Sequence, residues 1–151
     1  MKIVLKSLLS LFFLTFLYPV ILSSQEPIKK NNAIVVKGVT FGKVKETLLD
    51  AGIFIDEQNS EDGTIVTKRK GYCNCPNKDF YQLIYYIRVK DTIATIRGKW
   101  NVIIRPNDND VNNFMEVEYW KDKNSGPHYI FGIMTDFAKA LKGNSVEFKT
   151  L

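Results

Sequence analysis

The most restrictive feature of this sequence is a pair of neighbouring segments, residues 80–89 and 92–104, in which apolar and polar side chains alternate. Alternation with a period of two is typical of a β-strand that buries one face. The side chains predicted to be buried are Tyr81, Leu83, Tyr85, Ile87, Val89, Ala94, Ile96, Gly98, Trp100, Val102 and Ile104. We therefore expect the chain to fold around a long antiparallel hairpin with one apolar face.

The short connection between these segments predicts how they pair. A two-residue turn at Lys90–Asp91 would place Tyr85 opposite Ile96 and Val89 opposite Thr92. Both apolar sets then lie on the same side of the hairpin. A slip of one residue would move one set to the other side, so the buried face is strongly specified.

Two amphipathic helices and further strands complete the predicted fold. The apolar stripes of the helices are Phe41, Val44, Leu48 and Ala51 after Thr40 as a cap, and Ile130, Met134, Phe137 and Leu141 after Gly126–Pro127. Other strands are predicted at residues 33–39, 53–56, 63–70 and 114–120, the last with Met115, Val117 and Tyr119 on its inward side. Residues 144–151 could form a short strand or a loose tail. The sequence predicts an α+β fold of order β-α-β-β-β-β-β-α, with both helices on one face of a curved antiparallel sheet.

This order of elements resembles uncharacterised exported bacterial domains with a TATA-binding-protein-like fold. It is also similar to the helix-grip domains of outer-membrane assembly lipoproteins. The resemblance rests on IVVKGVTFGKVKETLLDAGIFIDEQNSEDGTIVTK, residues 34–68, together with the hairpin and the last helix. It implies the fold and an envelope or secreted setting, and it assigns neither an activity nor functional residues.

The N-terminus has the order of a secretory signal peptide. Lys2 and Lys6 precede an apolar run over residues 8–22, and Ser23–Ser24 provide small residues for cleavage before Gln25. The alternative is an uncleaved anchor, because about 18–20 apolar residues can span a bilayer. We expect a signal peptide over residues 1–24, a linker over 25–32, one domain over 33–143 and a tail over 144–151, with no stable membrane anchor after cleavage.

Net charge narrows the class of partner. The chain has 21 basic and 16 acidic side chains, and loss of residues 1–24 removes two lysines, which leaves about +3. So small a charge gives weak nonspecific binding to phosphates, and export separates the chain from nucleic acid. A protein, peptide or glycan of the envelope is the expected partner, at a periplasmic or secreted location.

Cys73 and Cys75 are separated by one residue in GYCNCPN. Residues two apart in a strand lie about 6.7 Å apart, near the upper limit for a disulfide of about 6.8 Å, so a bond between them needs a tight turn. An internal disulfide of a loop is one interpretation, because accessible thiols seldom stay reduced outside the cytosol. Mixed disulfides, redox exchange and soft-metal binding are the alternatives; zinc would need more ligands than these cysteines and His128 provide.

Other candidate sites are weaker. His128 stands at the start of the last helix without a recognised catalytic partner, and its candidacy as a general base rests on its being the single histidine. The loop with Asp108, Asp110 and Asn112 opens like a calcium loop but lacks the glycine and the glutamate of that motif. We therefore assign no catalytic residue, no metal and no cofactor.

The hairpin face opposite the helices is the preferred contact surface. Its cationic and aromatic side chains, together with those of the following strand, are Tyr86, Arg88, Arg97, Lys99, Phe114 and Trp120. Pairing of Val102 with Val117 would bring Lys99 beside Trp120, within reach of a cation–π contact. The alternatives are a solvated sheet face, a face covered by the N-terminal linker, and a homodimer contact. The sequence predicts a noncatalytic binding or accessory module of the envelope; the alternative is a thiol-redox or soft-metal-handling protein.

Overall fold

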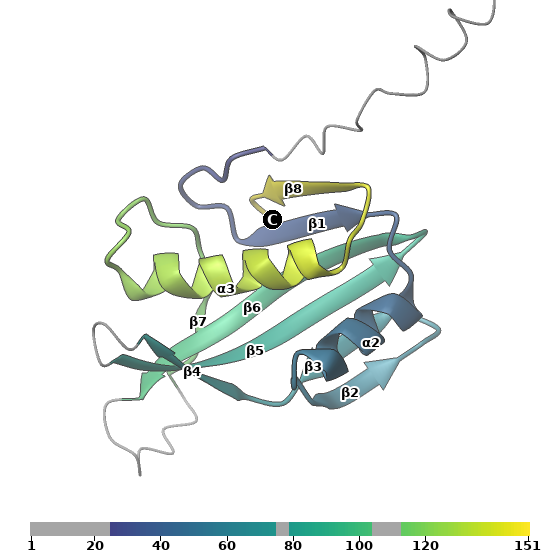
Figure 1. The fold of residues 1–151 in the computed structure, drawn as a ribbon, viewed down its shortest axis with the longest axis horizontal. Helices are drawn as coiled ribbons and strands as arrows, with labels where there is room; N and C mark the ends of the chain where they lie inside the picture. Colours follow the sequence, from purple (N-terminus) through teal and green to yellow (C-terminus); the bar gives the residue numbers. More distant parts are fainter. Residues whose placement is uncertain (1–24, 75–78, 104–112) are drawn as a thin grey trace, which may run out of the picture.

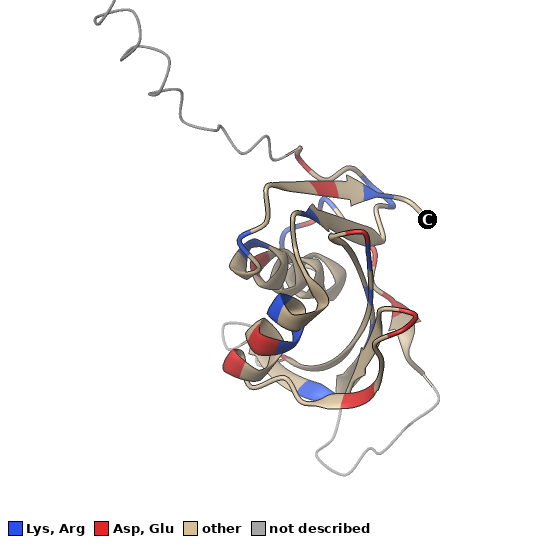
Figure 2. Cartoon of the chain, turned by 90° about the vertical axis from the view of Figure 1, so that its right-hand side faces the viewer, with Lys and Arg blue, Asp and Glu red and all other residues tan. Residues whose placement is uncertain are grey.

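The computed structural model describes residues 25–74, 79–103 and 113–151. Its elements are β1 (Ala33–Lys37), α2 (Phe41–Asp50), β2 (Ile55–Asn59), β3 (Thr64–Thr67), β4 (Lys70–Asn74), β5 (Asp79–Lys90), β6 (Ile93–Ile103), β7 (Met115–Glu116), α3 (Gly126–Ala140) and β8 (Ser145–Lys149). The eight strands form one antiparallel sheet in the order β2-β3-β5-β6-β1-β8, with β4 also paired to β5 and β7 to β6 (Figure 1). The predicted α+β fold with a curved antiparallel sheet is confirmed, and Figure 2 shows the sheet bending around the two helices.

The hairpin faces are as predicted, but the turn lies one residue further along the chain. Lys90 pairs with Ile93, so Asp91 and Thr92 form the turn, and Tyr85 lies opposite Gly98 rather than Ile96. Both turn residues have positive φ, 49° and 60°, as in a type I′ hairpin turn. The pairing shifts by two residues in total, so every side chain keeps its predicted face.

The core lies between the sheet and the helices. Leu83, Tyr85, Ile96 and Trp100 are buried there, and the ring of Tyr85 packs 5.2 Å from that of Phe137 in α3. These side chains belong to one continuous apolar cluster with residues of α2, α3, β1 and β8.

Two residues predicted to be inward lie at the edge of the core. Val102 is 41 % exposed and Met115 is 51 % exposed. Gly126, the first residue of α3, already lies over Tyr81 and Trp100, so the helix does not reach beyond them. The prediction that Val102 and Met115 are buried is therefore wrong, and Ile104 lies outside the described residues.

Both helices begin where expected. The hydroxyl of Thr40 accepts a hydrogen bond from the N–H of Lys43, and the hydroxyl of Ser125 accepts one from His128. α2 ends before Gly52, which has a φ of 65°. Ala51, predicted in the apolar stripe of α2, instead forms its C-terminal cap and is exposed.

Several strands differ from the predicted ranges. The strand predicted over 63–70 is divided into β3 and β4. The backbone N–H of Tyr85 donates a hydrogen bond to the hydroxyl of Thr67, which interrupts the backbone pairing at this place. The strand predicted over 53–56 runs over 55–59. The strand predicted over 114–120 shrinks to β7, because Tyr119 pairs through its N–H with the carbonyl of Asn31 instead.

The C-terminal residues belong to the sheet. Residues 145–149 form the strand that was one of the two alternatives for residues 144–151, and this strand, β8, pairs with β1. The domain therefore extends past residue 143, where we expected it to end. Residues 25–32, expected as a linker, are held to the domain near the same place. The N–H of Asn32 donates to the carbonyl of Lys149 at 2.9 Å.

Gly98 provides a test of the packing beneath α3. A methyl group at this position would lie 2.7 Å from Sδ of Met134 and 3.0 Å from a methyl group of Leu83. We expect Gly98→Ala to lower the free energy of unfolding by roughly 1–3 kcal/mol, because the surrounding core is already filled. Denaturant unfolding measures this.

Gly71→Ala is the matched control, since Gly71 also lies in a strand but has open space around its α-carbon. We expect this variant to be as stable as the natural chain within about 0.5 kcal/mol, or slightly more stable. An unchanged stability of Gly98→Ala would contradict the close packing of α3 on the hairpin.

Candidate binding site on the open sheet face

The hairpin displays a row of polar and cationic side chains on the face that carries no helix, here called the open face. Arg97 lies on this face while its neighbour Ile96 is buried, as the alternation predicts. Tyr86 and Arg88 of β5 are exposed beside it. The choice of inward side chains therefore fixes which side chains face outward.

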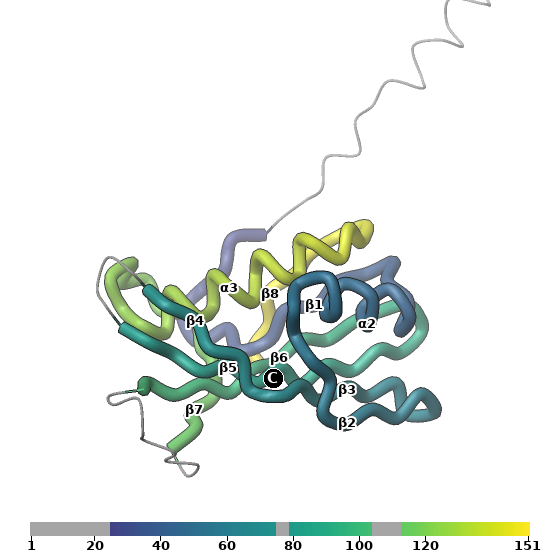
Figure 3. The backbone as a smooth tube through the Cα atoms, turned by 60° about the horizontal axis from the view of Figure 1, so that its bottom comes forward, coloured from purple at the N-terminus to yellow at the C-terminus, as the bar shows by residue number. Residues whose placement is uncertain are grey.

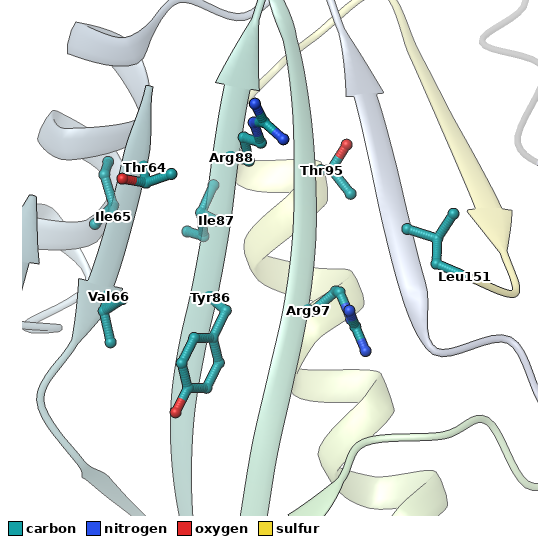
Figure 4. A pocket seen from close by; sticks show the side chains of 9 residues that line it. All are labelled: Thr64, Ile65, Val66, Tyr86, Ile87, Arg88, Thr95, Arg97 and Leu151. Atoms are coloured by element: carbon teal, nitrogen blue, oxygen red, sulfur yellow. The ribbon is translucent and has the colours of Figure 1, made fainter. Parts of the chain in front are cut away.

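A hollow of about 470 Å³ lies on the open face. Figure 4 shows its lining: Thr64, Ile65 and Val66 from β3, Tyr86, Ile87 and Arg88 from β5, Thr95 and Arg97 from β6, and Leu151 beyond β1. The hollow is thus lined by three neighbouring strands and by Leu151, which follows β8. Its volume falls within the range of about 300–1,000 Å³ that is usual for ligand sites.

The strand register explains why the sheet is hollowed here. Arg88 is flanked by Thr64 on β3 and by Thr95 on β6, and in the next row Val66 lies opposite Tyr86. Paired residues project from the same face of a sheet. Short threonine and valine side chains therefore alternate with long ones, which leaves space between the arginines and the tyrosine.

Two of the five polar side chains that line the hollow, Arg88 and Arg97, are cationic. Nη2 of Arg97 lies 3.1 Å from Oε2 of Glu116, which stands outside the hollow on β7. Nε of the same arginine is buried and has no hydrogen-bond partner among the described residues. Arg88 forms no ion pair within residues 25–74, 79–103 and 113–151.

A second charged group lies next to the hollow, towards the edge of the sheet. Glu147 of β8 pairs with Lys37, and Nζ of Lys149 lies 3.6 Å from its carboxylate. The hydrogen bond from Lys37 and the charges of the two lysines lower the pKa of Glu147. Its negative charge is thus shared by two lysines of the same chain.

The predicted contact residues divide into two groups. Tyr86, Arg88 and Arg97 line the hollow, whereas Lys99 lies next to it, with Nζ 5.5 Å from the ring centre of Tyr86. Lys99 lies opposite Glu116, so the predicted pairing of Val102 with Val117, and with it the contact between Lys99 and Trp120, is wrong.

Phe114 and Trp120 do not line the hollow. The guanidinium of Arg69 lies over the ring of Phe114, 5.5 Å from its centre. The backbone carbonyl of Trp120 is hydrogen-bonded to the imidazole of His128. Figure 3 shows β7 and β4 at the end of the hairpin away from β2 and β3. Sequence reasoning missed Thr64, Val66 and Leu151, although the alternation in TIVT, residues 64–67, was a usable signal for β3.

Two other candidate residues lie in the described part of the chain, Cys73 and His128, and both are hydrogen-bonded within the fold. The carbonyl of Cys73, at the end of β4, accepts a hydrogen bond of 2.8 Å from the hydroxyl of Tyr129. Cys75 and the loop with Asp108, Asp110 and Asn112 lie outside the described residues. Nδ1 of His128 lies 2.7 Å from the carbonyl of Trp120, and no group of three or more metal-ligating side chains occurs in the described part of the chain.

A smaller hollow, of about 320 Å³, opens between α3 and the C-terminal end of α2. Three of its four polar side chains, Lys70, Tyr72 and Tyr85, already form hydrogen bonds within the fold. Lys70 donates to the carbonyl of Ala51 at the end of α2, and the hydroxyls of Tyr72 and Tyr85 lie 3.4 Å apart. Burial raises the pKa of both tyrosines, so their hydroxyls stay protonated. The open face is therefore the better candidate.

Tyr81 allows a test of the core near Cys73. Burial, reinforced by the hydrogen bond of its hydroxyl to Asp79 at 3.0 Å, raises the pKa of Tyr81 to about 12. An unfolded chain loses this proton near pH 10, so between about pH 10 and 12 the folded state holds a proton that the unfolded state lacks, and stability falls as pH rises.

We expect Tyr81→Phe to reduce this alkaline loss of stability, as measured by denaturant unfolding at about pH 9 and about pH 11.5. The difference between the two pH values is compared between variant and natural chain, because other groups titrate equally in both. An identical loss in both chains would show that Tyr81 ionises freely in the folded protein.

The fold and the site together define a small α+β domain whose antiparallel sheet is covered by helices on one face and open on the other. No protein-family model matches the chain, and no curated protein matches it. Within the described residues, no helix combines the length and the apolar character needed to cross a bilayer.

Proposed function

We propose that this chain is a noncatalytic binding or accessory module of the bacterial envelope or secreted fraction, which contacts a partner through its open face. The observation that supports this most directly is the hollow of about 470 Å³ between Tyr86, Arg88 and Arg97. A hollow with an apolar floor and a few polar groups at its margin is the usual form of a binding site.

Charge and hydrogen bonding support binding rather than catalysis at this place. The polar side chains that line the hollow belong to arginines, threonines and a tyrosine, and no carboxylate side chain, cysteine or histidine of the described residues lines it. Arginine cannot give up its proton in a protein, so it binds and orients but does not act as a base.

The expected partner is a protein, peptide or glycan of the envelope, and a second copy of the chain is the alternative occupant. Export is part of the proposal. The basic start, the apolar run and Ser23–Ser24 predict removal of residues 1–24.

We expect the double variant Tyr86→Ser, Arg88→Ser to lose the partner that the natural chain retains. The tagged chain is expressed with its N-terminal segment in bacteria, crosslinked and purified from the envelope fraction, and bound proteins and glycans are identified by mass spectrometry. Both residues are exposed, so the melting temperature should be nearly unchanged.

The matched comparison is Cys73→Ser, Cys75→Ser, which we expect to keep the partner. The opposite pattern, with the partner lost only in the cysteine variant, would support the thiol-redox or soft-metal alternative. Light scattering of the purified chain identifies a homodimer, whose dissociation by the Tyr86→Ser, Arg88→Ser variant would assign the open face to self-association.

We expect the protein recovered from the envelope or the medium to begin at Gln25. Intact-mass measurement of the chain before and after reduction gives both its first residue and the oxidation state of Cys73 and Cys75. A chain that keeps residues 1–24 and stays with the membrane would show an uncleaved anchor.

A further inference from the structure

We propose that the hollow binds a carboxylate carried by an acidic peptide segment of the partner, with aliphatic side chains beside the carboxylate. This inference rests on the binding role proposed above for the same face. It adds the chemical class of the ligand, and it selects a peptide over a glycan.

Every polar side chain of the hollow can donate a hydrogen bond, and two of the five can only donate. The guanidinium groups of Arg88 and Arg97 donate and cannot accept, and the remaining polar side chains are the hydroxyls of Thr64, Thr95 and Tyr86. No carboxylate or amide side chain of the described residues lines the hollow. A neutral glycan brings no charge to the two guanidinium groups, whereas a carboxylate brings acceptors and the opposite charge.

Arg97 has a hydrogen-bond donor for which the described residues provide no acceptor. Its terminal nitrogen pairs with Glu116 at 3.1 Å, but its buried Nε lacks a hydrogen-bond partner among the described residues. A buried donor without a partner is unfavourable, and an acceptor supplied by a ligand would remove that cost. A carboxylate oxygen suits this place, because guanidinium and carboxylate groups form strong, directional pairs.

Arg88 provides a second cation close to the first. Arg88 lies opposite Thr95, and Arg97 lies opposite Tyr86, so the two arginines are diagonal neighbours on adjacent strands. Such neighbours have α-carbons about 7–8 Å apart, within reach of long side chains. Figure 4 shows Arg88 near the top of the view and Arg97 lower down on the adjacent strand. They could thus hold two acceptors along one extended ligand.

The surroundings favour an acidic partner with aliphatic side chains. Val66 and the 62 % exposed Leu151 offer apolar surface at two sides of the hollow. The five basic residues of the open face and its edge, Lys37, Arg88, Arg97, Lys99 and Lys149, outnumber the three carboxylates there, Glu57, Glu116 and Glu147. An approaching acidic segment is therefore attracted to this face.

The test compares two peptides that differ in one charge, acetyl-Leu-Glu-Leu-amide and acetyl-Leu-Gln-Leu-amide. Binding to the purified chain is followed by amide chemical shifts in two-dimensional NMR. We expect the glutamate peptide to bind at least about tenfold more tightly than the glutamine peptide, with shifts centred on β3, β5 and β6. Equal binding of the two peptides, or no binding of either up to about 10 mM, would overturn the carboxylate assignment.

Variants locate the contact. We expect Arg88→Gln and Arg97→Gln each to reduce the preference for the glutamate peptide several-fold. The Arg97→Lys variant keeps the charge but removes Nε, and we expect it to lose most of the preference for the glutamate peptide. Lys45→Gln, on α2 at the other side of the sheet, removes an equal charge and should leave the preference intact. A loss in Lys45→Gln of similar size would show general attraction instead of a site.

Three further outcomes have distinct meanings. Stronger competition by inorganic phosphate than by acetate would assign the hollow to a phosphoryl group and overturn the carboxylate. If the Tyr86→Ser, Arg88→Ser variant loses its envelope partner while both peptides bind equally, the ligand class is wrong and the binding face stands. If that variant keeps its partner, the proposed function fails, whatever the peptides do.

Discussion

Burial of one side of the β5–β6 hairpin is the constraint on which the rest of the structure depends. Full burial of a large apolar side chain contributes about 1.5–3 kcal/mol, whereas a single hydrogen bond contributes about 0.5–1.5 kcal/mol net. Leu83, Tyr85, Ile96 and Trp100 are all buried under the helices, so their combined contribution exceeds that of any one polar contact at the surface. Because neighbouring residues of a strand face opposite ways, this burial also decides which side chains remain outside. The candidate site is formed by the residues between the core residues.

The hollow on the open face and the hollow between the helices differ in whether the fold uses their polar groups. On the helix side, Lys70 is engaged with the end of α2, and the hydroxyls of Tyr72 and Tyr85 face each other. On the open face, Nε of Arg97 and the guanidinium of Arg88 have no comparable partner in the described part of the chain. A polar group without a structural role is the better indication of a site, since it has a cost that the fold does not recover by itself.

The sequence predicted those features that follow from local periodicity. The alternation assigned the faces of β5 and β6 correctly, and with them the outward direction of Arg97. The turn was misplaced because Thr92 has a positive φ, which is rare for a β-branched residue and which no local preference would select. The hairpin faces survived this error because the resulting shift is an even number of residues.

Features that depend on distant contacts were harder to predict. The pairing of Tyr119 with Asn31 draws the chain away from β6 after β7, so Trp120 never reaches Lys99. Leu151 reaches the hollow only because β8 pairs with β1, and nothing in the spacing of SVEFK identifies its partner strand. Three of the six predicted contact residues line the hollow because they share one short-range pattern, and the others relied on a strand register that periodicity alone does not determine.

The position of β1 has a consequence for how the chain folds. β1 lies between β6 and β8, and its side chains Ile34 and Val36 are fully buried. Its outer neighbour, β8, follows more than 100 residues later in the chain. Until β8 has paired, β1 is an unprotected sheet edge, which is a template for pairing with other chains. Chains cut short before residue 145 should therefore aggregate rather than fold.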